Sequence, residues 1–202
     1  MKKYSTIVFD LGNVLLPFDH TLWVSSFNKI EDELGTKMYD KYKQNFTLQM
    51  DYEGGKISDE EFININLEWL NYKVSGEEFC KIFSNIFSVD EDVVSLLPEL
   101  KKKYNLILLS NTSNIHKKYG WENYSFINYF DKLVLSHEVG IIKPDERIYR
   151  IVEDYTKDLS GSHIFIDDIF DNIIGAKKIG WDGIHFKGYE DLILEFKSRG
   201  II

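Results

Sequence analysis

The residues best suited to chemistry are aspartates that directly follow apolar segments of the chain. Asp10 comes after Ile7, Val8 and Phe9, at the end of a segment with strand character. A carboxylate at the end of a buried strand is costly to leave unpaired, so we expect it to have a specific role. As a nucleophile, Asp10 could form an aspartyl-phosphate or an ester. As a structural residue, it could open the turn before Gly12.

Asp167 and Asp168 give the strongest local signal, because two adjacent carboxylates end an apolar segment and Asp171 follows closely. These like charges repel one another. A hard cation with oxygen ligands relieves such repulsion, and Mg²⁺ is typically held by one or two carboxylates together with water and phosphate. The sequence therefore predicts a Mg²⁺ site here, with a solvated acidic turn before a helix as the alternative.

Two further segments could bind an anion such as a phosphoryl group. Ser110 and Asn111 begin a run of hydroxyl and amide side chains after an apolar segment, and such groups at a helix N-terminus favour anions. Lys143 precedes Pro144 and Asp145, which suit the first turn of a helix. A lysine fixed there could reach a phosphoryl oxygen. The alternatives are an ordinary helix cap and a surface lysine.

Five short segments rich in β-branched and aromatic residues are predicted to be strands: Thr6–Asp10, Leu106–Ser110, Lys132–Leu135, His163–Asp167 and Gly183–Phe186. The first, second and fourth are continuous apolar runs, as expected of parallel strands buried on both faces. Helical segments separate most of them: Asp92–Tyr104, Ile115–Tyr119, Glu146–Lys157 and Asn172–Ile179. This alternation predicts an α/β fold with a Rossmann-like, doubly wound parallel sheet, whose functional groups lie at the carboxyl ends of the strands.

The stretch from residue 17 to residue 90 has no strand pattern and several helical ones: Leu22–Leu34, Lys37–Phe46, Asp59–Leu70 and Glu77–Phe87. Ser58 and Glu61 have the spacing of a capping box, and Ser75 or Gly76 before Glu77 is a similar start signal. We predict a cap of the four-helix type, inserted after the first strand. The catalytic core would then comprise residues 1–16 and 91–202.

Composition narrows the class of protein. The 202 residues are 44% hydrophobic, which is enough for a sizeable core. The formal net charge of −9 and the absence of a basic run argue against a nucleic-acid or membrane-surface partner. No apolar run suits a signal peptide or a membrane span, and a single cysteine, Cys80, fits a reducing compartment. We expect a cytoplasmic protein, monomeric or weakly homo-oligomeric.

The order of these residues resembles the haloacid dehalogenase-like hydrolase superfamily. Between Asp10 and Gly180 occur a strand-end Asp, a helical insert, a strand-end Ser, a Lys before a helix and a strand-end Asp pair. The sequence Phe-Asp-Leu-Gly-Asn-Val, from Phe9 to Val14, is similar to a bacterial subgroup that includes an α-D-glucose-1-phosphate phosphatase. The likeness continues in segments 55–62, 109–112, 143–144 and 167–168.

The resemblance implies a metal centre built around the nucleophile. Asp10 would attack the substrate and also bind Mg²⁺. The backbone carbonyl of Gly12 and the carboxylate of Asp168 would complete the protein ligands. Asp167 and Asn172 would support them.

The resemblance also implies how the substrate is held. Ser110 and Asn111 would bind its phosphate group, and Lys143 would stabilise the charge on the phosphoryl oxygens. The helical insert would correspond to the cap of the family, which closes over the substrate and selects it.

One position departs from the commonest pattern of the superfamily. Most of its phosphatases carry a second Asp two residues after the nucleophile, and this chain has Gly12. Glycine cannot transfer a proton, and general acid–base catalysis typically contributes ~10²–10⁴-fold. The resemblance implies a Mg²⁺-dependent phosphomonoesterase of a small phosphorylated metabolite, for example the sugar phosphate glucose 1-phosphate. The alternatives are a 2-haloacid dehalogenase and a phosphometabolite-binding regulatory protein with little or no activity.

Overall fold

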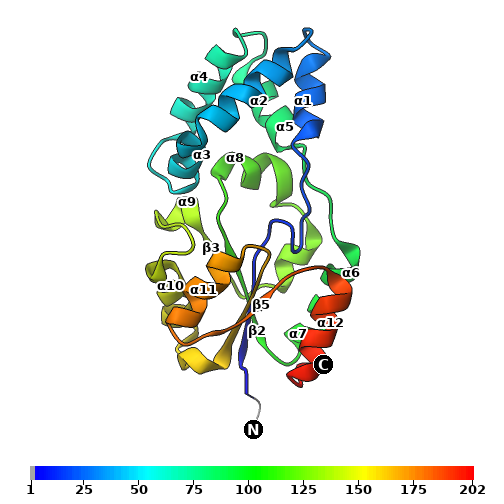
Figure 1. Cartoon of the computed structure of the whole chain (residues 1–202), viewed down its shortest axis with the longest axis vertical. Helices are drawn as coiled ribbons and strands as arrows, with labels where there is room; N and C mark the ends of the chain where they lie inside the picture. The colour runs from blue at the N-terminus through cyan, green and yellow to red at the C-terminus, as the bar shows by residue number, and fades with distance from the viewer. Residues whose placement is uncertain (1–2) are drawn as a thin grey trace.

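The computed structural model describes residues 3–202. It contains a five-stranded sheet in the order β3-β2-β1-β4-β5, and every neighbouring pair is parallel. The strands are β1 (Thr6–Phe9), β2 (Asn105–Ser110), β3 (Lys132–Leu135), β4 (His163–Asp167) and β5 (Asp182–His185). The predicted α/β fold with a parallel sheet is confirmed (Figure 1).

Successive residues of the central strands pack on opposite faces of the sheet. On β1, Ile7 and Phe9 belong to one hydrophobic cluster and Val8 belongs to the other. Both faces of β1 are buried, which explains its continuous apolar run. Among the helices that contribute to these clusters are α7 (Leu97–Lys101) and α12 (Tyr189–Ser198) in the first, and α10 (Glu146–Thr156) and α11 (Phe170–Lys178) in the second.

Five helices form a separate layer beyond the carboxyl ends of the strands (Figure 1). They are α1 (Thr21–Asn28), α2 (Leu34–Gln44), α3 (Phe46–Glu53), α4 (Asp59–Trp69) and α5 (Gly76–Ser84). Trp23, Phe27, Phe62 and Phe83 are among the residues of a hydrophobic cluster that these helices share. The cluster also includes Ile115, which lies outside these five helices. Full burial of one such aromatic side chain contributes about 1.5–3 kcal/mol.

Helices α4 and α5 begin at the serines that the sequence indicates. The hydroxyl of Ser58 accepts a hydrogen bond from the Glu61 amide at 3.2 Å, and the Glu61 carboxylate accepts one from the Ser58 amide at 3.5 Å. Ser75 and Glu78 form the same reciprocal pair at 3.3 and 2.9 Å. The capping box predicted at Ser58 is therefore confirmed, and of the two residues predicted as the second start, Ser75 is the N-cap and forms a capping box as well.

Two linker segments connect the helical layer to the sheet, and they run side by side. The amide of Ser88 donates to the carbonyl of Pro17 at 2.9 Å, and the amide of Asp90 donates to the carbonyl of Leu15 at 3.0 Å. The outgoing and returning segments are thus held in register by backbone hydrogen bonds.

The helical layer differs from the prediction in two places. The sequence predicts one helix over Leu22–Leu34, but α1 ends at Asn28, and α2 starts only after Glu33, whose φ is 59°. No helix is predicted over Phe46–Glu53, where α3 forms. Helix α3 lacks an apolar stripe because its buried Tyr52 packs in the core of the layer while other side chains line a cavity.

Three predictions outside this layer are also inaccurate. In place of one helix over Asp92–Tyr104, the chain forms the short helix α6 (Glu91–Val94) and then α7, with Pro98 in its first turn. The segment predicted as Ile115–Tyr119 forms α8 (Asn114–His116) and a π-helical turn over Lys117–Trp121. Helix α12 and the short α9 (Ser136–Val139) are not predicted. No helix within residues 3–202 is long and apolar enough to cross a membrane.

Candidate active site

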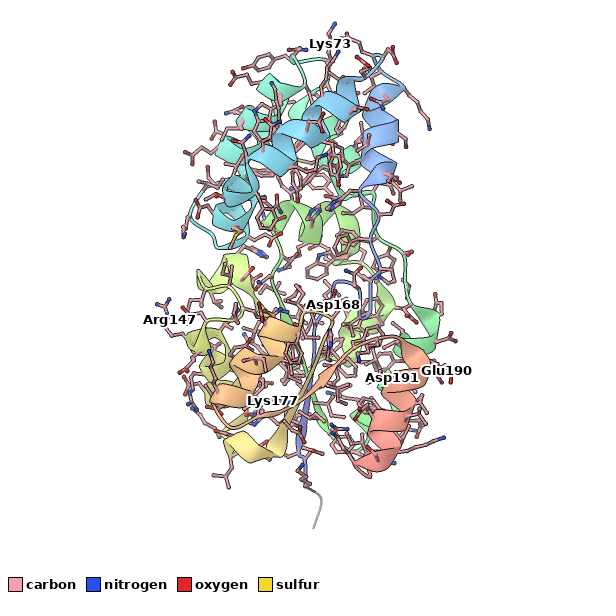
Figure 2. The ribbon with its side chains drawn as sticks, in the orientation of Figure 1. Lys73, Arg147, Asp168, Lys177, Glu190 and Asp191 are labelled. Carbon is pink, nitrogen blue, oxygen red and sulfur yellow. The ribbon has the colours of Figure 1, made fainter. Side chains whose placement is uncertain are left out.

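The predicted functional residues of three strands lie together at one edge of the sheet. Asp10 follows β1, Ser110 ends β2 and Asp167 ends β4. These strands are neighbours in the order β2-β1-β4. Asp168 lies next to them, at the edge that faces the helical layer (Figure 2). The parallel order of the strands therefore brings residues from distant parts of the sequence to one place.

Lys143, which precedes α10, is buried against two of these carboxylates. Its Nζ lies 2.8 Å from Asp10 Oδ1 and 2.7 Å from Asp167 Oδ2, and it donates a hydrogen bond to the carbonyl of Leu109 at 3.0 Å. Burial alone would lower the pKa of Lys143, but the negative charges of Asp10 and Asp167 outweigh it and raise the pKa. The ammonium group therefore remains charged at neutral pH and is fixed beside Asp10.

Asn111 holds the backbone of Lys143 in place. Its Nδ2 donates to the carbonyl of Lys143 at 3.1 Å, and the amide of Lys143 donates to its Oδ1 at 2.8 Å. The Asn111 side chain is thus engaged with the lysine. Any contact of Asn111 with a phosphate group is then expected from its backbone. Ser110 is buried and lines the same cavity as Asn111 and Lys143.

Asp167 is surrounded by hydrogen-bond donors. Its Oδ1 accepts from the amide of Ile169 at 2.7 Å, and Nδ2 of Asn172 lies 3.1 Å from both of its oxygens. Together with Lys143, these donors fix the orientation of the carboxylate. Asn172, predicted as a supporting residue, thus lies in contact with Asp167.

Asp168 is held by Asn13, which the sequence analysis does not single out. Nδ2 of Asn13 donates to Asp168 Oδ2 at 3.1 Å. The backbone of Asn13 has a φ of 53°, in the left-handed region that asparagine tolerates better than most residues. In the sequence, this left-handed conformation is indicated only by an asparagine that directly follows Gly12. Burial raises the pKa of Asp168.

The three aspartates fit a divalent cation. Asp10, Asp167 and Asp168 each offer an oxygen, and these oxygens lie within 4.8 Å of one another. Burial raises the pKa of Asp10; the charge of Lys143 opposes the rise and that of Asp167 adds to it. A cation would relieve the repulsion among these carboxylates, and oxygen donors of this kind suit Mg²⁺.

A cavity of about 340 Å³ lies between the sheet edge and the helical layer. On the sheet side it is lined by Asp10, Ser110, Lys143 and Asp168, among others. On the opposite side it is lined chiefly by residues of α3 and of the linkers. Its volume is in the range typical of small-molecule sites.

Residues 7–186 match the family of haloacid dehalogenase-like hydrolases. The chain belongs to this family. It is 28% identical over 183 residues to D-ribitol-5-phosphate phosphatase from Bacteroides thetaiotaomicron, with 87% of this chain and 88% of that protein covered. It is 26% identical over 179 residues to a pyrimidine 5′-nucleotidase from Escherichia coli, with 79% of this chain and 73% of that protein covered.

The fold of this hydrolase is also similar to solved structures. One is a HAD family enzyme from Bacteroides thetaiotaomicron in complex with magnesium and inorganic phosphate. The TM-score is 0.79 at 26% identity, with 91% of this chain and 94% of that chain covered.

In this hydrolase, Gly12 lines the cavity close to Asp10. It is not among the residues with positive φ, so its backbone conformation is open to other residue types. A Cβ at this position would meet Cε1 of Phe18 at 3.2 Å, at the far end of a side chain that is 39% exposed. Backbone strain therefore does not explain the absence of an acid here.

His116 is a buried histidine that lines the cavity of the hydrolase. Its ring stacks on Phe83 at a centroid distance of 4.7 Å and meets the edge of Phe87 at 5.3 Å. Nδ1 has no hydrogen-bond partner among residues 3–202. Burial, with a smaller effect of His20, lowers the pKa of His116 to about 3.

The buried His116 should make folding stability depend on pH. In the unfolded chain the group titrates near 6.5, whereas in the folded protein it stays neutral until about pH 3. The neutral His116 therefore does not reduce the free energy of unfolding above pH 6.5. As the pH falls from 6.5 to about 3, the free energy of unfolding decreases by up to about 1.4 kcal/mol per pH unit, because only the unfolded chain binds the proton. Urea unfolding at pH 7 and pH 5 measures the loss. His116→Gln should show a smaller loss, and an equal loss in both proteins would contradict the assignment.

Proposed function

We propose that this hydrolase is a Mg²⁺-dependent phosphatase of small phosphorylated metabolites, acting on sugar or polyol phosphates through an aspartyl-phosphate on Asp10. The observation that carries the proposal is the buried Asp10, which contacts Lys143 and lies beside Asp167 and Asp168 in the lining of a cavity. Two similar proteins named as phosphatases of small phosphorylated molecules support it.

Asp10 is positioned to attack phosphorus through one particular oxygen. Its Oδ1 accepts hydrogen bonds from the amide of Leu11 at 2.7 Å and from Lys143 at 2.8 Å. Oδ2 is therefore the oxygen available to form the bond to phosphorus, while the leaving oxygen departs from the opposite side. Lys143 and the hydroxyl of Ser110 lie where they can stabilise the negative phosphoryl oxygens.

The carboxylates divide between metal binding and positioning. Mg²⁺ would be held by Asp10, Asp168 and the carbonyl of Gly12, and it supplies positive charge that offsets the repulsion between the nucleophile and the phosphoryl group. Asp167 already accepts hydrogen bonds on both oxygens, so we assign it to orienting Lys143.

Hydrolysis of the aspartyl-phosphate by water completes the cycle. The water oxygen forms a bond to phosphorus, the bond from phosphorus to Asp10 breaks, and the carboxylate is restored. Because the side chain of Gly12 can neither donate nor accept a proton, the leaving oxygen must take its proton from water or another residue, or depart with more negative charge. Substrates with good leaving groups, such as anomeric or aryl phosphates, should react fastest.

Phosphate release from a panel of monoesters, with and without Mg²⁺, tests the proposal. The panel includes glucose 1-phosphate, ribitol 5-phosphate, a pyrimidine nucleotide and p-nitrophenyl phosphate, with 2-chloropropionate as a dehalogenase substrate. Mg²⁺-dependent release of phosphate from a sugar or polyol phosphate is the expected result. Chloride release without metal would identify a dehalogenase, and binding without turnover would identify a regulatory protein.

Gly12→Asp should increase the rate for poor leaving groups by up to ~10²–10⁴-fold, because it restores a group able to donate a proton. The gain should be small for p-nitrophenyl phosphate, whose leaving group needs little assistance. A series of aryl and alkyl phosphates measures the slope of log kcat/KM against leaving-group pKa. Gly12→Ala, which adds the same contact with Phe18, is the matched control. An unchanged slope in a folded Gly12→Asp protein would show that another group supplies the proton.

A further inference from the structure

Helix α3 presents a polar pair to the cavity, opposite the predicted phosphate site. Gln49 and Glu53 are four residues apart, so they share one face of the helix. Nε2 of Gln49 donates a hydrogen bond to Glu53 Oε1 at 2.7 Å. Both residues line the cavity that Asp10 and Lys143 line from the other side.

The pair has unused capacity to accept hydrogen bonds. Gln49 is only 4% exposed, yet its Oε1 has no partner among residues 3–202. Leaving such a buried acceptor unsatisfied costs about 1–3 kcal/mol. Burial raises the pKa of Glu53 above its usual value, and the hydrogen bond from Gln49 and the charge of Lys143 offset this rise only in part. A ligand beside the pair would therefore need to donate hydrogen bonds.

The cavity lining offers little to a second anionic group. Of the lining residues, Lys143 is the only lysine or arginine, and it is already engaged with Asp10 and Asp167. The two histidines in the lining, His20 and His116, have their pKa values lowered by burial and are neutral at pH 7. On the side of the helical layer, the cavity is thus lined, among residues 3–202, by one carboxylic acid, that of Glu53, and by no lysine or arginine.

Apolar side chains also contribute to the lining of the cavity. Phe18, Phe46, Met50 and Phe87 line it, and they offer surfaces for the C–H faces of a carbon chain or ring. A polyhydroxylated molecule has both the C–H surface and the O–H donors that this lining accommodates. A carboxylate or a second phosphate would instead lie near Glu53 and be repelled.

We propose that Gln49 and Glu53 bind hydroxyl groups of the substrate, so that the hydrolase selects phosphomonoesters of uncharged polyhydroxylated molecules and rejects those with a second anionic group. The inference rests on the proposed phosphatase function and adds its selection rule. A site built to bind a hydroxyl discriminates strongly, because an analogue without the donor leaves buried acceptors unpaired.

The test compares glycerol phosphate with 3-phosphoglycerate, in which a carboxylate replaces the terminal CH₂OH. The wild-type protein should have the higher kcat/KM for glycerol phosphate. Glu53→Gln, which removes the charge and keeps the shape, should reduce the ratio of the two kcat/KM values by about 10–100-fold, as expected for a hydrogen bond to a charged group. The decrease in kcat/KM caused by Glu53→Gln should be at least several-fold smaller for p-nitrophenyl phosphate than for glycerol phosphate, because p-nitrophenyl phosphate has no hydroxyl group to bind. Glu68→Gln, an exposed glutamate on α4, is the matched control and should leave the ratio unchanged.

Three outcomes would overturn the inference: an unchanged ratio in Glu53→Gln, equal losses for all three substrates, or losses that follow leaving-group pKa instead of hydroxyl content. Failure of the phosphatase proposal would appear differently, as absence of phosphate release from every ester. In that case calorimetry of glycerol phosphate and 3-phosphoglycerate binding to the wild-type and Glu53→Gln proteins measures the same ratio without turnover. Equal affinities of the wild-type protein for the two would then refute the selection rule.

Discussion

Replacing Asp10 with asparagine is expected to lower kcat by a factor on the order of 10⁴–10⁶. Asparagine keeps the shape of the side chain but has no anionic oxygen to form a bond to phosphorus. The fold should be retained, because Lys143 keeps its contacts with Asp167 and with the carbonyl of Leu109. Single-turnover phosphate release measures the effect, with far-UV circular dichroism as the check on folding.

A covalent adduct provides the complementary evidence for Asp10. Beryllium fluoride, which mimics a phosphoryl group on aspartate, should inhibit the wild-type protein in the presence of Mg²⁺ and should not bind to Asp10→Asn in the same way. Asp171→Asn, an exposed aspartate in the first turn of α11, serves as a control and should retain activity. Undiminished turnover in Asp10→Asn would rule out covalent catalysis at this residue.

Removal of the metal is expected to abolish phosphate release, and added Mg²⁺ should restore it. Three carboxylates share a single lysine at the site, so without a cation the phosphoryl group would approach an excess of negative charge. Asp168→Asn should weaken Mg²⁺ binding and leave the sheet intact, because the side chain of Asp168 is partly exposed. Activity titrated against Mg²⁺ after treatment with EDTA measures both effects.

Thermal unfolding reports the same binding event independently of turnover. A ligand that binds the folded state alone stabilises it by about 2.7 kcal/mol at 100 times its Kd. Mg²⁺ should therefore raise the melting temperature of the wild-type protein and of Asp171→Asn more than that of Asp168→Asn at the same concentration. Full activity in EDTA would contradict the phosphatase mechanism and favour metal-independent dehalogenase chemistry.

The sheet and the grouping at its edge follow from simple features of the sequence. Parallel strands that are buried on both faces appear in the sequence as continuous apolar runs. Three such runs end at Asp10, Ser110 and Asp167. Since β1 lies between β2 and β4, strand-end residues necessarily meet. The position of Lys143 beside Asp10 is a tertiary contact that no local pattern contains, and the resemblance to the family was needed to anticipate it.

The parts that were not predicted depend on contacts between distant segments. Helix α3 lacks a clear apolar stripe, because one of its faces borders the cavity rather than the core. The hydrogen bond from Asn13 to Asp168 depends on a left-handed backbone conformation that several residue types can adopt. Gln49 and Glu53 resemble ordinary polar residues of a surface helix until the fold places them opposite Lys143.

The paired linkers have a consequence for how such a protein can diversify. The chain leaves the sheet edge and returns to it along segments that are hydrogen-bonded to each other through Pro17 and Ser88. A different helical bundle whose two ends lie equally close could replace α1–α5 without displacing β1 or β2. We therefore expect that the chemical groups of the sheet and the lining that we propose to contact the rest of the substrate can be inherited separately. New substrate preferences can arise by exchange of one module while the nucleophile and its lysine stay in place.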